Sequence, residues 1–326
     1  MSCEEIIADL TARELLPPAQ AAAIRDYERT RPFSLHYELR TLLYLGIVLL
    51  SGGLGVLLYQ HLDELSHGVI IAGLVTILLA CFLYAFRHRA PFTWQLAPPA
   101  GVLPDYLLLL GCLTFLTLEG YVQAQYQVFG TRYGLALMLP AVLFFALAYL
   151  FDHRGVLSMA ITALAAWVGV SIAPTSAFVR NDFSSVDLSG SAILLGLLLL
   201  GAGLASERLN RKPHFAFTYI SLGSNLALLA ATAALFSYQR AVLPPFAAGI
   251  LILAISTFLV WYARRTHSYL FLLMGVVYGY IVVTYGFFQL LDFSGGDWFL
   301  ASLYFPLSAA GVVFLFKNIH KILRQP

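Results

Sequence analysis

The basic residues of this chain are confined almost entirely to alternate gaps between long apolar segments. All but three of the 19 Lys and Arg residues occupy one set of gaps. That set holds Arg13, Arg25, Arg29, Arg31, Arg40, Arg87, Arg89, Arg154, Arg208, Arg211, Lys212, Arg264, Arg265, Lys317, Lys321 and Arg324. The other set holds only Arg132, Arg180 and Arg240. This alternation is typical of a protein that crosses a membrane many times, because short basic loops stay on the cytoplasmic side.

The composition agrees with a chain whose main solvent is lipid. Hydrophobic residues make up 60% of the sequence and charged residues 11%, with a mean hydropathy of +0.80, whereas soluble domains carry roughly 25% charged residues. An apolar stretch of about 20 residues crosses a hydrocarbon core about 30 Å thick. Ten such spans are predicted, at residues 39–59, 69–86, 103–122, 133–151, 155–173, 190–206, 215–236, 242–262, 269–290 and 298–316. The polar end of the third span is open to a helical or a loop interpretation.

These spans predict an all-α polytopic transmembrane helical bundle over residues 39–317. Helices satisfy every backbone amide within the spanning segment, and the apolar runs lack the alternation of barrel strands. The first 38 residues lack the apolar core and cleavage site of a secretory signal, so we expect the first span to be retained. Both termini are predicted to be cytoplasmic, including a basic tail at residues 318–326.

The segment before the first span, residues 1–38, is predicted to form a cytoplasmic helical hairpin. Ile6, Ile7 and Leu10 recur at helical spacing, and Pro17 and Pro18 separate them from a second helical segment. A hairpin this small cannot bury a core of its own. Its apolar stripe is expected to dock on the inner face of the bundle or on the membrane, with a cytoplasmic protein partner as the alternative.

Three stretches of this sequence resemble a known family of bacterial membrane proteins. They are LTARELLPPAQAAAIRDYE in the hairpin, LGIVLLSGGLGVLLYQHLDEL in the first span and LTFLTLEGYVQAQYQVFG in the third. Together they resemble the predicted integral membrane proteins of domain-of-unknown-function family 2157 over roughly residues 5 to 150. The resemblance implies a multi-pass protein of the bacterial cytoplasmic (inner) membrane. It implies no particular activity, because the family has no established one.

The third span carries the most unusual polar group, because Glu119 lies within an apolar run. An ionisable residue inside a membrane is costly, which makes it a candidate functional residue. Glu119, Gln123 and Tyr126 share one helical face through their spacing of four and three. Thr114, Thr117, Tyr121 and Gln125 add to the polarity of this segment. We predict a ligand-binding face on Glu119, Gln123 and Tyr126; the alternative is a carboxylate that reaches interfacial water.

The ninth span supplies a second set of candidate ligand-binding residues. Tyr278, Tyr285 and Gln289 lie along one helical stripe and could orient a ligand in a cavity. The alternative is that they form hydrogen bonds between helices. Gly275 and Gly279 form a GxxxG motif on the same span, which we interpret as a close contact between helices. Asn225 in the seventh span is likewise interpreted as a residue that packs between helices.

Enzymatic, metal and nucleic-acid sites are not predicted. None of the eight histidines lies at mid-span, so the paired axial ligands of a haem bundle and the buried general base of an acyl transferase are both missing. His61, Asp63, Glu64 and His67 could form a weak outer metal site, but a solvated loop is favoured. Cys3, Cys81 and Cys112 form no CxxC pair and suit packing positions. No cofactor or nucleic-acid partner is expected; the expected partners are the lipid bilayer and a cytoplasmic protein or a second copy of the chain.

Two functions follow from these features. The first is a transporter-like bundle for a small molecule or lipid, because ten spans divide into two inverted halves of five. The second is a membrane-embedded scaffold or sensor that uses residues 1–38 to bind a partner. The shortage of charge within the spans fits the second hypothesis, and the polar strip around Glu119 favours the first.

Overall fold

The computed structural model describes residues 66–97, 101–130, 133–172, 186–236, 243–290 and 298–318, together with scattered residues between 11 and 56. The chain divides into two compact units, Met1–Leu54 and Gly55–Pro326. The predicted hairpin at residues 1–38 and the predicted first span at residues 39–59 fall mostly outside the described residues. The fold is therefore given for the second unit.

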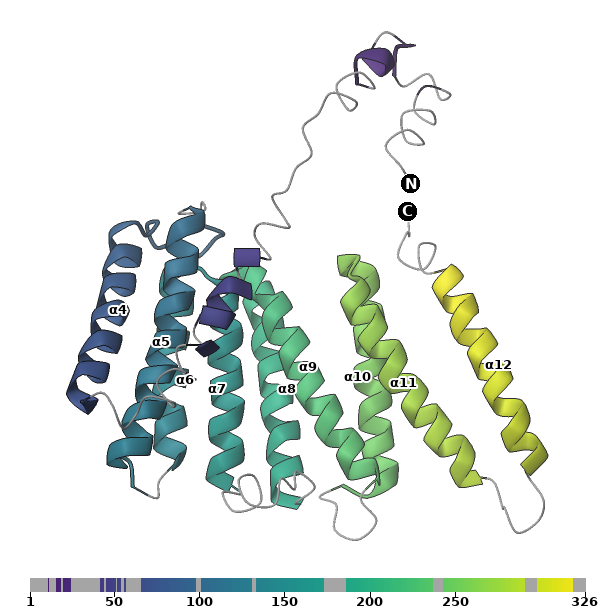
Figure 1. Ribbon diagram of the computed structural model, residues 1–326. Coiled ribbons are helices and arrows are strands. Elements are labelled where there is room, and N and C mark those ends of the chain that lie inside the picture. Colours follow the sequence, from purple (N-terminus) through teal and green to yellow (C-terminus); the bar gives the residue numbers. More distant parts are fainter. Residues whose placement is uncertain are drawn as a thin grey trace. The chain divides into compact units, whose positions relative to one another are not determined.

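All regular secondary structure in the described part of this unit is helical, and no strand occurs there. Its long helices are α4 (His67–Arg87), α5 (Val102–Tyr126), α6 (Tyr133–Phe151), α7 (Arg154–Ile172), α8 (Val186–Arg208), α9 (Ala216–Phe236), α10 (Pro245–Thr266), α11 (Tyr269–Leu290) and α12 (Trp298–Lys317) (Figure 1). A short 3-10 turn, η2 (Pro213–Phe215), precedes α9. Each long helix covers one predicted span, from the second to the tenth. The polar end of the third span is helical, since α5 continues to Tyr126.

The length and apolarity of these helices are those of membrane spans. Eight of them, among the described residues, are long and apolar enough to cross a membrane. In α12 the apolar helix is shorter, at Ser302–Phe314. The chain is thus a helical membrane bundle, as predicted from the sequence.

The helices run in alternating directions, so their connections fall into two groups (Figure 1). One end of the unit holds the connections from α4 to α5, α6 to α7, α8 to α9 and α10 to α11. Every Arg and Lys that the structure describes lies in or beside these connections or at the end of α12: Arg87, Arg89, Arg154, Arg208, Arg211, Lys212, Arg264, Arg265 and Lys317. We call this end the basic end and the other the opposite end.

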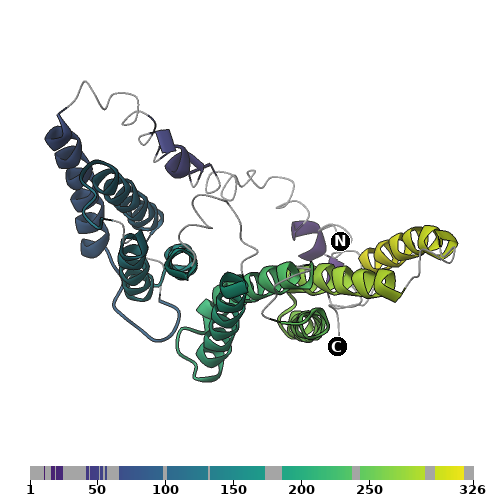
Figure 2. The same ribbon diagram turned by 90° about the horizontal axis from the view of Figure 1, so that it is seen from below.

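Consecutive helices pack as hairpins, with α4 on α5, α6 on α7, α8 on α9 and α10 on α11 (Figure 2). The closest of these contacts joins α8 and α9 through two glycines. A Cβ atom on Gly196 would lie 2.6 Å from the carbonyl oxygen of Gly223, and one on Gly223 would lie 2.8 Å from the carbonyl oxygen of Gly196. The two backbones therefore touch, and neither position has room for a side chain.

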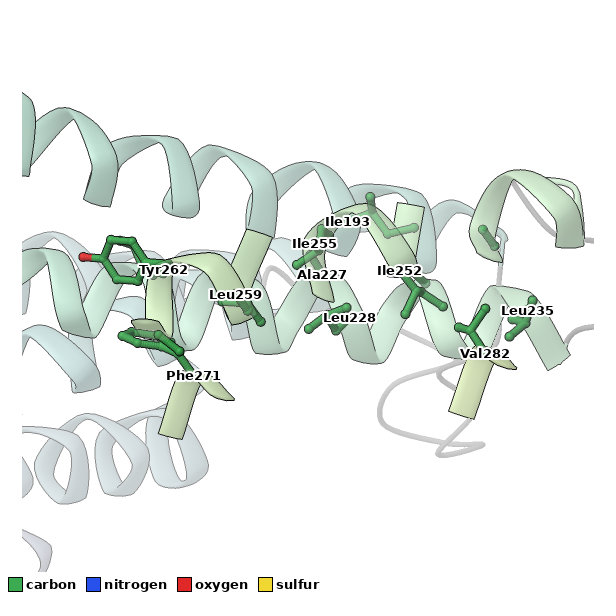
Figure 3. Packing of buried hydrophobic residues seen from close by; sticks show 14 of the residues in the cluster. Ile193, Ala227, Leu228, Leu235, Ile252, Ile255, Leu259, Tyr262, Phe271 and Val282 are labelled. Atoms are coloured by element: carbon green, nitrogen blue, oxygen red, sulfur yellow. The ribbon is translucent and has the colours of Figure 1, made fainter. Parts of the chain in front are cut away.

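Helix α9 takes part in two apolar clusters. One cluster joins α8 to α11 and includes Ile193, Leu228, Ile252 and Phe271 (Figure 3). The other lies among α4 to α9 and includes Phe144, Leu157 and Phe215. Cys81 and Cys112 are buried free thiols, in agreement with the packing positions predicted for them.

The turn between α6 and α7 places an acidic residue at the basic end. Asp152 adopts the left-handed conformation with φ 57°, and the next amide, of His153, donates a hydrogen bond to the Ala148 carbonyl at 3.1 Å. A left-handed residue commonly ends a helix in this way, and Asp accepts that conformation at lower cost than most residues. The turn is only two residues long, so Asp152 is held close to the ends of both helices.

Candidate functional site

A cavity whose lining includes three polar side chains lies between α5 and α6. Its volume is about 430 Å³, within the usual range of small-molecule sites. The lining residues are Leu116, Glu119, Gly120, Gln123, Ala124 and Gln127 on the α5 side and Ala136, Leu137 and Pro140 on α6. Glu119 lies about two turns before the end of α5, so the cavity is roughly 10 Å from the opposite end.

Two hydrogen-bond acceptors in this cavity lack an ordinary donor. The Oε1 atom of Glu119 is buried and accepts no hydrogen bond from any residue that the structure describes. Pro140 interrupts α6 and has no N–H group, so it cannot donate to the carbonyl of Ala136 one turn earlier. An isolated ionised carboxylate is costly in a low-dielectric setting. A proton or a positively charged solute in the cavity would stabilise this carboxylate.

The other two predicted residues of α5 are placed differently from each other. Gln123 lines the cavity beside Glu119, but its amide also holds the turn after α5. Its Oε1 accepts from the Phe129 amide at 3.0 Å, and its Nε2 donates to the Gly130 carbonyl at 3.2 Å. Tyr126 is 53% exposed and lies 6.3 Å from the His67 ring, outside the cavity lining. The structure thus brings Glu119 and Gln123 together and leaves Tyr126 apart.

Two residues of the predicted stripe on α11, Tyr278 and Tyr285, contact α9, whereas Gln289 is exposed. The Tyr278 hydroxyl donates to Asn225 Oδ1 on α9 at 3.3 Å. Gln289 Nε2 donates to the Tyr285 hydroxyl at 3.0 Å, and the Tyr285 ring packs against Phe236 with centroids 5.2 Å apart. None of these side chains lines the cavity between α5 and α6.

The GxxxG motif of α11 is a packing contact, as predicted. A Cβ on Gly275 would lie 2.8 Å from the carbonyl oxygen of Ser256 on α10. The hydrogen bond between Tyr278 and Asn225 confirms the packing interpretation of Asn225 as well. Both contacts are of the kind that holds neighbouring membrane helices together.

A second cavity, of about 520 Å³, lies among α7, α8 and α9 near the opposite end. The space is left by small residues, namely Ala165, Ala166, Gly169, Ala192, Ala230 and Ala233. Ser189 and Ser191 are the polar residues of its lining, which includes no charged side chain. The chemistry of this cavity suits hydrocarbon rather than a polar solute.

At the basic end, one carboxylate joins three connections of the chain. Asp152 Oδ1 accepts hydrogen bonds from Lys212 Nζ at 2.7 Å and from His214 Nε2 at 2.6 Å. Its Oδ2 accepts from the backbone amide of Ala97 at 2.8 Å. We call Asp152, Lys212, His214 and Ala97 the Asp152 cluster. Burial raises the pKa of Asp152, but the bonds from Lys212, Ala97 and His214 outweigh it and leave the pKa below its usual value.

Aromatic rings and backbone contacts enclose the Lys212 ammonium group. It lies 5.2 Å from the centre of the Phe92 ring and 5.9 Å from that of Phe215, at cation–π distances. The Lys212 amide donates to the Trp94 carbonyl at 2.7 Å, and the Ser206 hydroxyl donates to the Lys212 carbonyl at 2.9 Å. The connection from α4 to α5 is thereby fastened to the connection from α8 to α9.

This cluster is not predicted from the sequence: Lys212 is interpreted there as an orientation signal, and His214 only as one of the histidines outside the middle of a span. Asp152 and Lys212 are 60 positions apart in the chain, so no spacing rule connects them. The available signal was an acidic residue in a gap that otherwise carries basic side chains. Such a residue is a candidate ion-pair partner when it lies in a very short turn.

The predicted outer metal site is only partly described. His61, Asp63 and Glu64 lie outside the described residues, while His67 Nδ1 lies 2.8 Å from the Tyr121 hydroxyl. Within the part of the chain that the structure covers, no group of three His, Cys, Asp or Glu side chains could hold a metal ion.

Comparison with known proteins yields one match. No curated protein and no solved structure matches the chain. Residues 8–157 match the sequence model of a family described as predicted membrane protein (DUF2157). The matched segment includes the cavity between α5 and α6, together with Trp94, Ala97 and Asp152, and it ends before Lys212 and His214. Over residues 8–157 the chain is therefore similar to the DUF2157 family of predicted membrane proteins, the family whose resemblance its sequence indicated.

Proposed function

We propose that this protein is a transporter-like helical bundle that binds a small organic cation in the cavity between α5 and α6. The observation that carries the proposal is the buried Oε1 atom of Glu119, which has no hydrogen-bond donor among the described residues and lines a cavity of about 430 Å³. A positively charged group that enters the cavity satisfies this carboxylate and removes the cost of its isolation.

The surroundings of Glu119 support binding of a solute with both charge and hydrogen-bond donors. The Ala136 carbonyl lacks its usual helical hydrogen-bond donor because Pro140, one turn later, has no backbone N–H group. Interrupted helices with free backbone carbonyls coordinate cations in several transporter architectures. Gln123 and Gln127 line the same cavity and add amide groups.

The proposal includes an orientation in a bacterial cytoplasmic membrane. The basic end and both termini are cytoplasmic, and the Glu119 cavity is reached from the outside. Support comes from the uneven distribution of Lys and Arg in the sequence, since basic loops are retained inside. The alternative function, a scaffold or sensor that acts through residues 1–38, depends on a segment outside the described residues.

Cysteine labelling tests whether the cavity is open to water and negatively charged. The background variant carries Ala in place of Cys3, Cys81 and Cys112, and Ala124→Cys is then added on the cavity lining. In vesicles that expose the outside, we expect a cationic methanethiosulfonate reagent to modify Ala124→Cys several times faster than an anionic one. Adding Glu119→Gln should remove this preference, and adding Thr117→Val should keep it. Thr117 bonds the Leu113 carbonyl and does not line the cavity.

Uptake into proteoliposomes tests the transport function itself. The probe is radiolabelled guanidinium, because it stays charged at neutral pH, carries N–H donors for the Glu119 carboxylate and does not cross the bilayer as a neutral base. We expect saturable uptake by the wild-type protein, loss of that uptake in Glu119→Gln and normal uptake in Thr117→Val. Equal uptake by the wild-type protein, by Glu119→Gln and by protein-free vesicles contradicts the proposal.

A further inference from the structure

An exposed aromatic and basic surface lies beside the Asp152 cluster at the basic end. Its members are Phe92, Trp94, Leu96, Leu209 and Arg211, which we call the Trp94 patch. The four apolar members are each about half exposed or more. They come from the connection that follows α4 and from the one that follows α8. The Phe92 and Trp94 rings meet edge to face with centroids 5.2 Å apart.

The patch is held in place by three hydrogen bonds, each of which involves a backbone group. The Trp94 carbonyl accepts from the Lys212 amide, and Gln95 Nε2 donates to the Asn210 carbonyl at 3.5 Å. The Ala97 amide donates to Asp152 at 2.8 Å. These contacts hold the two connections together on both sides of the patch.

Arg211 gives the patch its charge. Its guanidinium group lies over the Trp94 ring, 5.2 Å from the ring centre. In such a stack the planar group leaves its N–H edge available, and this edge suits a phosphate group in a bidentate arrangement. No carboxylate among the described residues forms an ion pair with Arg211. Asp152, the acidic group of the adjoining cluster, is 7% exposed and already bonded to Lys212 and His214.

The position of the patch along the helices indicates the partner. The candidate spans His67–Arg87 and Leu188–Arg208 both end just before it, so its residues lie where hydrocarbon gives way to water. Trp and other amphipathic side chains concentrate at that level, next to lipid headgroups. At this level lipid already surrounds the ends of the spanning helices. A soluble acidic protein would therefore have to displace lipid before it could contact Phe92, Trp94 and Leu96.

We propose that the Trp94 patch is a binding site for the headgroup of an anionic phospholipid of the surrounding bilayer. Arg211 binds the phosphate, while Phe92, Trp94 and Leu96 contact the glycerol region and the upper part of the acyl chains. Arg89, on the connection after α4, and Arg208, at the end of α8, are also exposed and add to the positive potential that attracts an anionic lipid. This inference is independent of the Glu119 cavity.

Fluorescence quenching by brominated lipid tests the site in the full-length protein. The protein is reconstituted in vesicles that contain equal amounts of phosphatidylglycerol and phosphatidylcholine, with bromine on the acyl chains of only one lipid at a time. The chain has four Trp residues, so the signal of Trp94 is the difference between the wild-type protein and Trp94→Phe. We expect brominated phosphatidylglycerol to compete for Trp94 about fivefold better than brominated phosphatidylcholine, since one near-surface Arg contributes roughly that factor.

Two Arg variants distinguish a specific site from general attraction. Arg211→Gln should bring the preference for phosphatidylglycerol close to one, and Arg211→Lys should keep part of it, because the charge remains while the planar donor edge is lost. Arg265→Gln is the matched control: Arg265 is also exposed at the basic end but faces Glu207 at 3.9 Å. It should leave the preference unchanged.

Three results overturn the proposal. Equal quenching of Trp94 by both brominated lipids shows that the patch does not select an anionic headgroup. Absence of quenching by either lipid shows that the patch faces water or a protein, the outcome expected for an acidic protein partner. An equal loss of preference in Arg211→Gln and Arg265→Gln shows a diffuse charge effect. Circular dichroism of each variant confirms that the comparison is made on folded protein.

Discussion

Lys212 and Asp152 form an ion pair with 2.7 Å between Nζ and Oδ1, and their side chains are only 1% and 7% exposed. The pair joins the connection from α8 to α9 with the turn from α6 to α7. Through the Ala97 amide, the same carboxylate also joins the connection from α4 to α5. Three hairpins that are separate in the sequence are therefore tied together at the basic end.

Asp152→Asn should strongly destabilise the protein. The substitution removes the negative charge and leaves the Lys212 ammonium group buried without compensation, a change that costs about 3 to 5 kcal/mol in other proteins. The free energy of unfolding can be measured by titrating sodium dodecyl sulfate into detergent micelles and following circular dichroism. Lys212→Met should cost less, because Asp152 keeps its bonds from His214 and Ala97. If both variants unfold at the wild-type midpoint, the pair contributes nothing to stability.

Stability should fall in acid because of the same carboxylate. The pKa of Asp152 is lowered in the folded protein, so the folded state favours the ionised form. Its contribution is complete above the unfolded-state pKa of about 3.9 and is lost as the pH falls from there through the lower folded-state pKa. The measurement is the difference in unfolding free energy between the wild-type protein and Asp152→Asn as the pH is lowered. This difference should shrink below about pH 4; a difference that is constant down to the lowest pH contradicts the assignment.

Gly223→Ala should separate α8 from α9. The new methyl group would lie 2.8 Å from the Gly196 carbonyl oxygen and 2.9 Å from the Leu200 amide nitrogen. Both obstacles are backbone, so the helices must move apart, at a cost of about 1 to 3 kcal/mol. Gly201→Ala is the matched control on α8, because its methyl group would meet no atom within 4 Å. The control should stabilise the protein by roughly 0.5 to 1 kcal/mol through its better helix propensity, and a stability gain in Gly223→Ala would refute the close contact.

Ser256→Ala should be neutral or slightly stabilising. The Ser256 hydroxyl is buried on α10 and has no hydrogen-bond partner among the described residues, so its removal relieves an unsatisfied polar group. Ser224→Ala on α9 provides the comparison, since the Ser224 hydroxyl donates to the Ile220 carbonyl. That variant should lose about 0.5 to 1.5 kcal/mol. The same micelle titration checks both, and a larger loss in Ser256→Ala than in Ser224→Ala would show that the Ser256 hydroxyl has a partner.

Parts of the candidate site were predictable because they depend on one helix alone. Glu119 and Gln123 are four residues apart, and this spacing places them on one face of α5 wherever the helix packs. Tyr126 continues the same face, yet α5 ends there and its side chain is half exposed beside His67. Whether that face borders a cavity depended on α6, where Pro140 and Ala136 supply the opposite wall.

The sequence by itself determined that the chain forms membrane helices and where α4 to α12 run, since apolarity and backbone hydrogen bonding act within each segment. It also assigned the described Lys and Arg residues to alternate connections. Only the tertiary structure decided that Lys212 is a buried partner of Asp152 and that Arg211 is an exposed neighbour of Trp94. These adjacent cations look alike in sequence, and their different environments arise because an ion pair forms only where packing brings distant segments within a few ångströms.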